Sequence, residues 1–447
     1  MFLQKHKTEI FIFLVIFIVY SFFTILKIAN DLPVQNLGSD QYFQIAANLA
    51  EKHSFSLDNA GPTALRMPGY PFFLALALKI FHNWWLIIFL QNIISGLTGV
   101  FLYLIAKKWL PFAFAIATSF VWAFEPYAID ISQQFLTETI YTFFVVMSVF
   151  IFIKFRAETN KKIFFPVIIL LLSILTYIKP ISLFLPLIFI TALIYHQRTK
   201  SAVPVIAILI IYTALLSPWL IRNHATFGHW QFSSDNVSSL YITSLYFKAD
   251  ENKEQRPPPE IPEESGFRKF EKSGDLSNSS IKIKSAISVI ISNPLRFSKF
   301  YFKNFIISIA KSSWYGSIKN LLRGSSGNVN YHKEIKEAVF NLDMDKILHF
   351  SAKEIASLII MLSGIIFWLL ILSLAFLGSL FSLKYLPAEN RPALILLIGI
   401  IAYLLLAGNM AIDDMIRYRF PASPFIAIFA MYGLFSLFKF KSIKQSV

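Results

Sequence analysis

The sequence contains no cysteine among its 447 residues. Disulfide bonds, thiolate nucleophiles and zinc–thiolate sites are therefore excluded. The chain also lacks a P-loop, a G-x-G-x-x-G turn and a G-x-S-x-G elbow, the motifs typical of ATP-driven pumps, dinucleotide-binding folds and serine hydrolases. The energy for any group transfer must then already be present in the substrate.

The histidines form no metal-binding pattern. No H-x-H or H-x-x-x-H pair with a carboxylate neighbour occurs, so the sequence predicts no metal held by protein ligands alone.

Charged residues are also few, at 15% of the chain, whereas 56% of residues are hydrophobic and the mean hydropathy is +0.59. The apolar residues are gathered in long runs almost free of charge, as a helix needs to cross a bilayer. The sequence predicts an all-α polytopic membrane protein with about ten transmembrane helices. The expected spans are 10–29, 84–106, 112–126, 138–153, 163–178, 181–195, 202–221, 355–383, 393–409 and 419–438.

The formal net charge of +15 is explained by orientation in the membrane, because basic residues gather in short cytoplasmic loops. Lys5 and Lys7 precede the first apolar run, which lacks a small-residue cleavage site and is predicted to be an uncleaved helix. We therefore expect a multi-pass protein of the inner (plasma) membrane with both termini in the cytoplasm. No nucleic-acid partner is indicated.

Three regions are predicted. Residues 1–221 form an N-terminal membrane module whose first outer loop is 30–83, residues 222–354 form a long extracytoplasmic loop, and residues 355–447 form the C-terminal membrane helices. The long loop carries a Pro/Glu-rich run at 248–266, which is typical of disorder. After it, an amphipathic basic and aromatic segment beginning at Asn293 favours an interfacial helix.

The stretch 38–71 combines a carboxylate, an amphipathic helix pattern and an arginine. Tyr42, Ile45, Ala46 and Leu49 share one face of a short helix, which can lie on the membrane surface. Asp40 either caps this helix or serves as a general base that takes a proton from an acceptor hydroxyl.

Five cations fall at the outer ends of predicted spans, each within a few residues of a proline. They are Arg66, Lys179, Arg222, Arg417 and Arg419. A single such side chain can reach lipid phosphate at the surface, but five together favour a pocket for a phosphorylated lipid. Glu138 heads an apolar span and is either a functional residue or compensates the helix dipole.

The order of motifs resembles bacterial GT-C glycosyltransferases of the protein mannosyltransferase and aminoarabinose transferase type, including the lipopolysaccharide-core sugar transferases. The resemblance rests on SDQYFQIAANLAEKHSFS, RMPGYPFFLALALKIF, FLTETIYTFF, YIKP, SPWLIRNHATFGHWQFSS, NPLRF and RYRFPASPFIAIFA. The chain departs from the family at Gln41, where several relatives carry a second acid, and at Arg66–Gly69, where K-P-P or H-P-P is common.

The resemblance implies an enzyme, a hexosyl- or pentosyltransferase, that moves a sugar from a polyprenyl-phosphate donor to a lipid, glycan or protein acceptor at the extracytoplasmic face. It assigns the catalytic acid of the first outer loop to Asp40. Substrate binding is assigned to Arg66, Tyr70, Glu138, Lys179, Arg222, Arg417 and Arg419. A divalent metal bridging Asp40 and the donor phosphate stays an open alternative.

Two other classes also stay open: a flippase or transporter, and a polymerase or ligase of lipid-linked glycans. A flippase is expected to place charges inside the bundle at mid-membrane depth, whereas here the ionisable groups gather at the outer ends of the spans.

Overall fold

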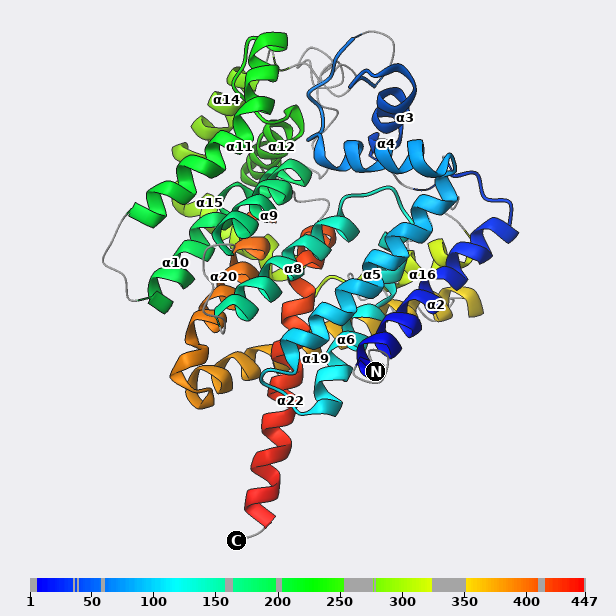
Figure 1. Cartoon of the computed structure of the whole chain (residues 1–447), viewed down its shortest axis with the longest axis vertical. Coiled ribbons are helices and arrows are strands. Elements are labelled where there is room, and N and C mark those ends of the chain that lie inside the picture. The colour runs from blue at the N-terminus through cyan, green and yellow to red at the C-terminus, as the bar shows by residue number, and fades with distance from the viewer. Residues whose placement is uncertain are drawn as a thin grey trace.

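The computed structural model describes residues 6–34, 37, 40–57, 61–156, 164–197, 203–252, 276, 279–323, 351–408 and 415–445, and every element within these ranges is helical. The prediction of an all-α membrane protein is confirmed. In Figure 1 the start of α2 and the end of α22 both lie well away from α3 and α4, the helices of the first predicted outer loop.

The helices of the N-terminal region follow the apolar runs closely. They are α2 (Lys7–Ala29), α3 (Tyr42–Lys52), α4 (Gly69–Phe81), α5 (Trp84–Ala106), α6 (Phe112–Ala123), α7 (Pro126–Ser132), α8 (Glu138–Arg156), α9 (Phe164–Ile178), the 3₁₀ helix η2 (Pro180–Phe184), α10 (Leu185–Gln197) and α11 (Val203–Phe227). The bounds of α5 coincide with the predicted span, because Asn83 caps it by accepting a hydrogen bond from Trp85 N at 2.8 Å.

The remaining helices belong to the long loop and the C-terminal region. They are α12 (Ser234–Asn252), α14 (Ser279–Ser292), α15 (Pro294–Ala310), α16 (Trp314–Arg323), α19 (Ala352–Tyr385), η4 (Ala388–Asn390), α20 (Arg391–Gly408), α21 (Met415–Arg419), η5 (Phe420–Ala422) and α22 (Ser423–Gln445). Ser351 and Glu354 form a capping box that begins α19.

The predicted count of ten spans is not confirmed. Among the described residues, six helices are long and apolar enough to cross a membrane, or seven if α6 and α7 form one bent span. The runs at 163–178 and 181–195 form shorter apolar helices. Their interruption at Lys179 and Pro180 has a local cause, since the residue before proline is disfavoured in the helical conformation.

The break between α6 and α7 has the same origin. The two helices meet at 58°, and Glu125, the residue before Pro126, has an extended backbone and caps α7 by accepting from Ala128 N. Asp130 lies within α7.

Within the long segment 222–354, the structure describes residues 222–252, 276, 279–323 and 351–354. Its described part contains four helices rather than one, and a small core of Phe247, Phe297 and Phe300 packs α12 against α15. The helix α16 packs back onto the membrane module, where Asn320 donates to Asp130 Oδ2 at 3.2 Å. Most of the Pro/Glu-rich run expected to be disordered lies outside the described residues.

Helices α19 and α22 cross with their backbones in close contact. A Cβ atom on Gly378 would lie 1.8 Å from Phe429 O, and one on Gly433 would lie 2.2 Å from Leu374 O. Small residues allow this approach, which gives van der Waals contact along two membrane helices.

We expect Gly378→Val to separate α19 from α22 and to lower stability markedly, because the new side chain meets backbone that has no room to move. Denaturant titration of the purified protein in detergent measures this. Gly316→Ala, at a helical glycine with open space around its Cβ position, is the matched control and should be neutral or stabilising by up to about 1 kcal/mol. Equal losses of stability in both variants would contradict the interpretation that glycine at 378 permits the close contact of α19 and α22.

Candidate active site

Asp40 lies at the entrance of α3 in an unusual backbone conformation. Its φ is 41° and that of Gln41 is 69°, so two adjacent residues occupy the left-handed region that costs energy for residues other than glycine. No side chain caps α3. The alternative that Asp40 serves as a helix cap is therefore wrong, and its carboxylate is directed to another partner.

That partner is Arg417, which is far from Asp40 in the sequence. Arg417 Nη1 donates to Asp40 Oδ2, and Arg417 Nε donates to Glu138 Oε1 at 2.9 Å. One guanidinium thus binds two carboxylates that belong to the stretch before α3 and to the start of α8. This geometry agrees with the expectation that Asp40, Glu138 and Arg417 act in one site.

Glu138 is the buried centre of this site, with a side chain that is 0% exposed. Lys179 Nζ donates to the same Oε1 atom at 2.7 Å. Lys179 lies between α9 and η2, in extended backbone that places its side chain over the rings of Tyr141 and Tyr418. Burial lowers the pKa of the Lys179 ammonium, and the Glu138 carboxylate opposes that shift.

We call Asp40, Glu138, Lys179 and Arg417 the charged cluster. Its exposure is graded: the Asp40 side chain is 35% exposed, Arg417 18% and Lys179 11%, whereas Glu138 is fully enclosed. The Asp40 carboxylate is therefore the acidic group of the cluster that a ligand reaches most easily.

Arg66 contacts the backbone of Asp40 rather than its carboxylate. Arg66 Nε donates to Asp40 O at 3.1 Å, and its guanidinium lies 5.2 Å from the centre of the Tyr42 ring. Nearby, a Cβ atom on Gly69 would lie 2.7 Å from the Tyr177 backbone, so glycine permits the close approach of α4 to the end of α9. These contacts fix the loop of Asp40 beside Lys179.

Arg222 and Tyr70 hold the same stretch in other ways. Arg222 Nη1 donates to Thr63 O at 2.9 Å, and its guanidinium packs against Phe55, Trp219 and Phe227. Tyr70 is fully buried and donates to Gln91 Oε1 at 2.7 Å. The hydroxyl of Tyr70, a residue predicted to bind substrate, is thus directed to a partner inside the protein.

Arg419 does not join Arg417, although the sequence places them together. Its Nη1 atom donates to the carbonyls of Ile309 and Lys311, and its guanidinium stacks 3.7 Å from the centre of the Trp368 ring. Arg419 is almost completely buried. The expectation that both arginines clamp one phosphate is corrected: the helix α21 presents them to different surroundings.

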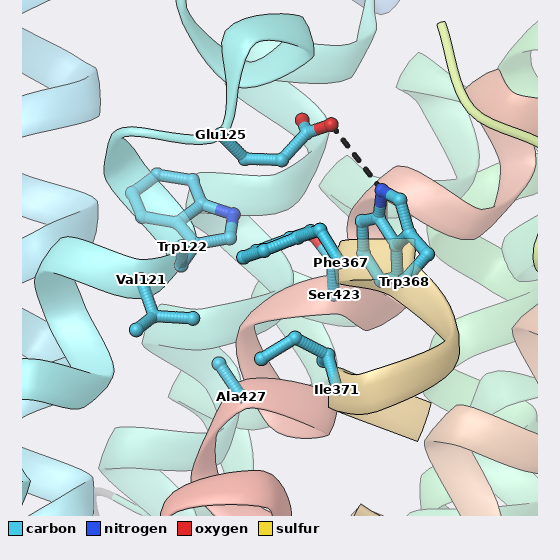
Figure 2. Close-up of a pocket in the computed structure, with 8 residues that line it drawn as sticks. All are labelled: Val121, Trp122, Glu125, Phe367, Trp368, Ile371, Ser423 and Ala427. Atoms are coloured by element: carbon cyan, nitrogen blue, oxygen red, sulfur yellow. Dashed lines mark hydrogen bonds between the residues drawn. The ribbon is translucent and has the colours of Figure 1, made fainter. Parts of the chain in front are cut away.

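The surroundings of Arg419 contain a second buried carboxylate. Glu125 Oε1 accepts from Trp314 Nε1 at 3.0 Å and from Trp368 Nε1 at 3.4 Å, the latter bond being drawn in Figure 2. The same figure shows the carboxylate at one side of a small pocket whose walls come from α6, α19 and α22. This arrangement joins α16, α19 and the α6–α7 break.

Sequence reasoning missed the roles of Trp314 and Trp368. No local pattern distinguishes them from other aromatic residues, of which the chain has 47 Phe, 18 Tyr and 8 Trp. The sequence pointed to these tryptophans only indirectly, through Glu125. This carboxylate precedes a proline inside an apolar run, and a charge buried there requires hydrogen-bond donors.

The charged cluster does not form a metal cage. Within the described ranges, no group of three or more His, Cys, Asp or Glu side chains could hold a metal ion. Both carboxylates of the cluster are already bound by Arg417 or Lys179, so the residues present do not fit a metal held by the protein.

We expect Glu138→Gln to destabilise the protein by about 3–5 kcal/mol, because it leaves Arg417 and Lys179 without their shared buried carboxylate. Denaturant titration in detergent measures the loss. Adding Lys179→Met to Glu138→Gln should recover part of it by removing one unpaired cation. An additive double variant would show that the two side chains are not coupled.

Arg419→Gln is expected to lower stability by about 2 kcal/mol or more, because the carbonyls of Ile309 and Lys311 lose the charged donor that a buried guanidinium supplies. Arg417→Gln, two residues away and more exposed, should cost less stability but more activity. Comparing melting temperature and turnover for the pair measures this. If both variants lost melting temperature and turnover in the same proportion, the structural role given to Arg419 and the functional role given to Arg417 would be contradicted.

Comparison with known proteins points to one family. Residues 62–221 match the model of the dolichyl-phosphate-mannose-protein mannosyltransferase family, a segment that contains Arg66, Glu138 and Lys179. A search of curated proteins finds no match.

Among solved structures, the crystal structure of ArnT from Cupriavidus metallidurans bound to undecaprenyl phosphate is similar at 12% identity and a TM-score of 0.39, over 97% of this chain and 78% of that chain. A similarity this distant does not establish shared details. The family match confirms the resemblance indicated by the motifs: over residues 62–221 the chain is similar to membrane glycosyltransferases of the protein mannosyltransferase type.

Proposed function

We propose that this protein is a membrane glycosyltransferase that transfers a sugar from a polyprenyl-phosphate donor to a lipid, glycan or protein acceptor at the extracytoplasmic face of the inner membrane. The observation that carries the proposal is the ion pair between Asp40 and Arg417. Arg417 also binds the buried Glu138, which in turn binds Lys179. It places a reachable carboxylate directly beside cations of the kind that bind phosphate.

In this reaction Asp40 is the general base. The acceptor hydroxyl oxygen forms a bond to the anomeric carbon of the sugar while its proton passes to the Asp40 carboxylate. The bond from the anomeric carbon to the phosphate oxygen breaks, and its electron pair stays on the phosphate. One displacement of this kind inverts the configuration of the sugar.

Arg417 and Lys179 stabilise the charge that develops on the leaving phosphate. Their positions are set before the reaction by the buried Glu138 carboxylate, so little reorganisation is needed when the charge forms. Arg66 and Arg222 are positioning residues in this scheme, because each donates to a backbone carbonyl of the stretch 38–71. They keep the Asp40 loop in place while the substrates bind.

We expect Asp40→Asn to reduce sugar transfer by about 10²–10⁴-fold, because the amide cannot take the hydroxyl proton. The assay uses purified protein in detergent, a synthetic polyprenyl-phosphate monosaccharide and extracted membrane lipids or peptides as acceptors, with products identified by mass spectrometry. Asp31→Asn, at an exposed aspartate at the end of α2, is the matched control and should retain activity.

Full activity of a folded Asp40→Asn protein would overturn the role of Asp40. Transport of a lipid-linked glycan across vesicles without any transfer would instead favour the flippase alternative. Adding a chelator and then Mg²⁺ or Mn²⁺ to the same assay tests whether a divalent ion bridges Asp40 and the donor phosphate.

A further inference from the structure

Arg417 makes two ion pairs that differ in strength. Its Nε side faces Glu138, which is completely enclosed and is also bound by Lys179 at 2.7 Å. Its Nη1 side faces Asp40, whose side chain is 35% exposed. Ion pairs open to solvent contribute little stability, whereas breaking a buried one leaves an uncompensated charge. Of the two pairs, the one with Asp40 is the easier to break.

The backbone at Asp40 also favours release of its carboxylate. Asp40 and Gln41 both adopt left-handed conformations, which cost energy and persist only where surrounding contacts impose them. Arg66 holds the Asp40 carbonyl, so the side chain can leave Arg417 while the loop remains attached. The Arg417 pair is one of the contacts that impose this conformation.

The pair has a chemical consequence for the base. A carboxylate oxygen that already accepts an N–H from arginine has one lone pair fewer to offer to a hydroxyl proton. The Nη1 group of Arg417 that donates to Asp40 is also a group to which a phosphate oxygen would bind. Asp40 and a phosphate oxygen therefore need the same N–H group.

We infer that Asp40 and the donor phosphate compete for Arg417, so that binding of the donor frees the base. This inference rests on the proposed function and adds a regulation of the same site. In the free enzyme Asp40 is held by Arg417. When the polyprenyl phosphate binds, it takes over the Nη1 donor, Glu138 keeps Nε in place, and Asp40 turns to the acceptor hydroxyl.

The competition has an unusual consequence: removing the catalytic charge should strengthen donor binding. Asp40→Asn takes away the competitor, and asparagine tolerates the left-handed backbone at this position. We expect it to bind undecaprenyl phosphate about three- to tenfold more tightly than the natural protein, since binding no longer has to break the pair. Tryptophan fluorescence titration in detergent measures the dissociation constant.

The controls separate this effect from simple electrostatics. Asp31→Asn changes the net charge by the same amount at a site away from Arg417 and should leave affinity unchanged. Undecaprenol, which lacks the phosphate, should bind both Asp40 forms equally. Glu138→Gln, which loosens the anchored side of Arg417, should weaken phosphate binding. Asp40→Ser serves as a second competitor-free variant if Asp40→Asn does not stay monodisperse.

The outcomes distinguish the two proposals. Tighter binding by Asp40→Asn, with Asp31→Asn unchanged, supports the competition. Unchanged or weaker binding by Asp40→Asn and Asp40→Ser, while the natural protein binds the phosphate, overturns the competition and leaves the proposed function standing. Absence of phosphate-dependent binding by the natural protein overturns the proposed function and the competition with it.

Discussion

The interaction on which the site depends is the bridge that Arg417 makes between Asp40 and Glu138. It joins the stretch before α3, the start of α8 and the helix α21, and Arg417 lies 377 positions from Asp40 and 279 from Glu138 along the chain. Because Glu138 is buried and also binds Lys179, the bridge anchors the connection between α9 and η2 as well. A single guanidinium therefore helps to fix the relative positions of four segments, and Asp40 is the more exposed of the two acids in the cluster.

The site is built where helices are interrupted. Pro180 follows Lys179, Pro126 follows Glu125, and Pro421 comes two positions after Arg419. Each interruption releases backbone groups and turns a charged side chain out of a regular helix. Inside a membrane protein such irregular backbone is tolerated only where polar partners surround it, and those partners are present here as Glu138, the carbonyls of Ile309 and Lys311, and the indoles of Trp314 and Trp368.

Arg417 and Arg419 show how residues of the same type acquire different roles. On a helix, positions two apart lie roughly 200° from each other, so neighbouring arginines cannot face the same ligand. Arg417 points to the partly open charged cluster, whereas Arg419 is buried against Trp368 and the end of α15. The first bridges two carboxylates, and the second ties the end of α15 to α21 and α19.

The sequence by itself determined the all-helical membrane architecture, the bounds of α5 and the group of residues from which the site is made, because these follow from local apolar runs, caps and charges near prolines. It did not settle the number of spans, since short apolar helices such as α9 resemble spans in composition. Only the tertiary structure decided that Asp40 pairs with Arg417, that Tyr70 is internal and that Arg419 belongs to another cluster. Those relations depend on which helix faces meet, and the packing of distant segments sets this rather than any local pattern.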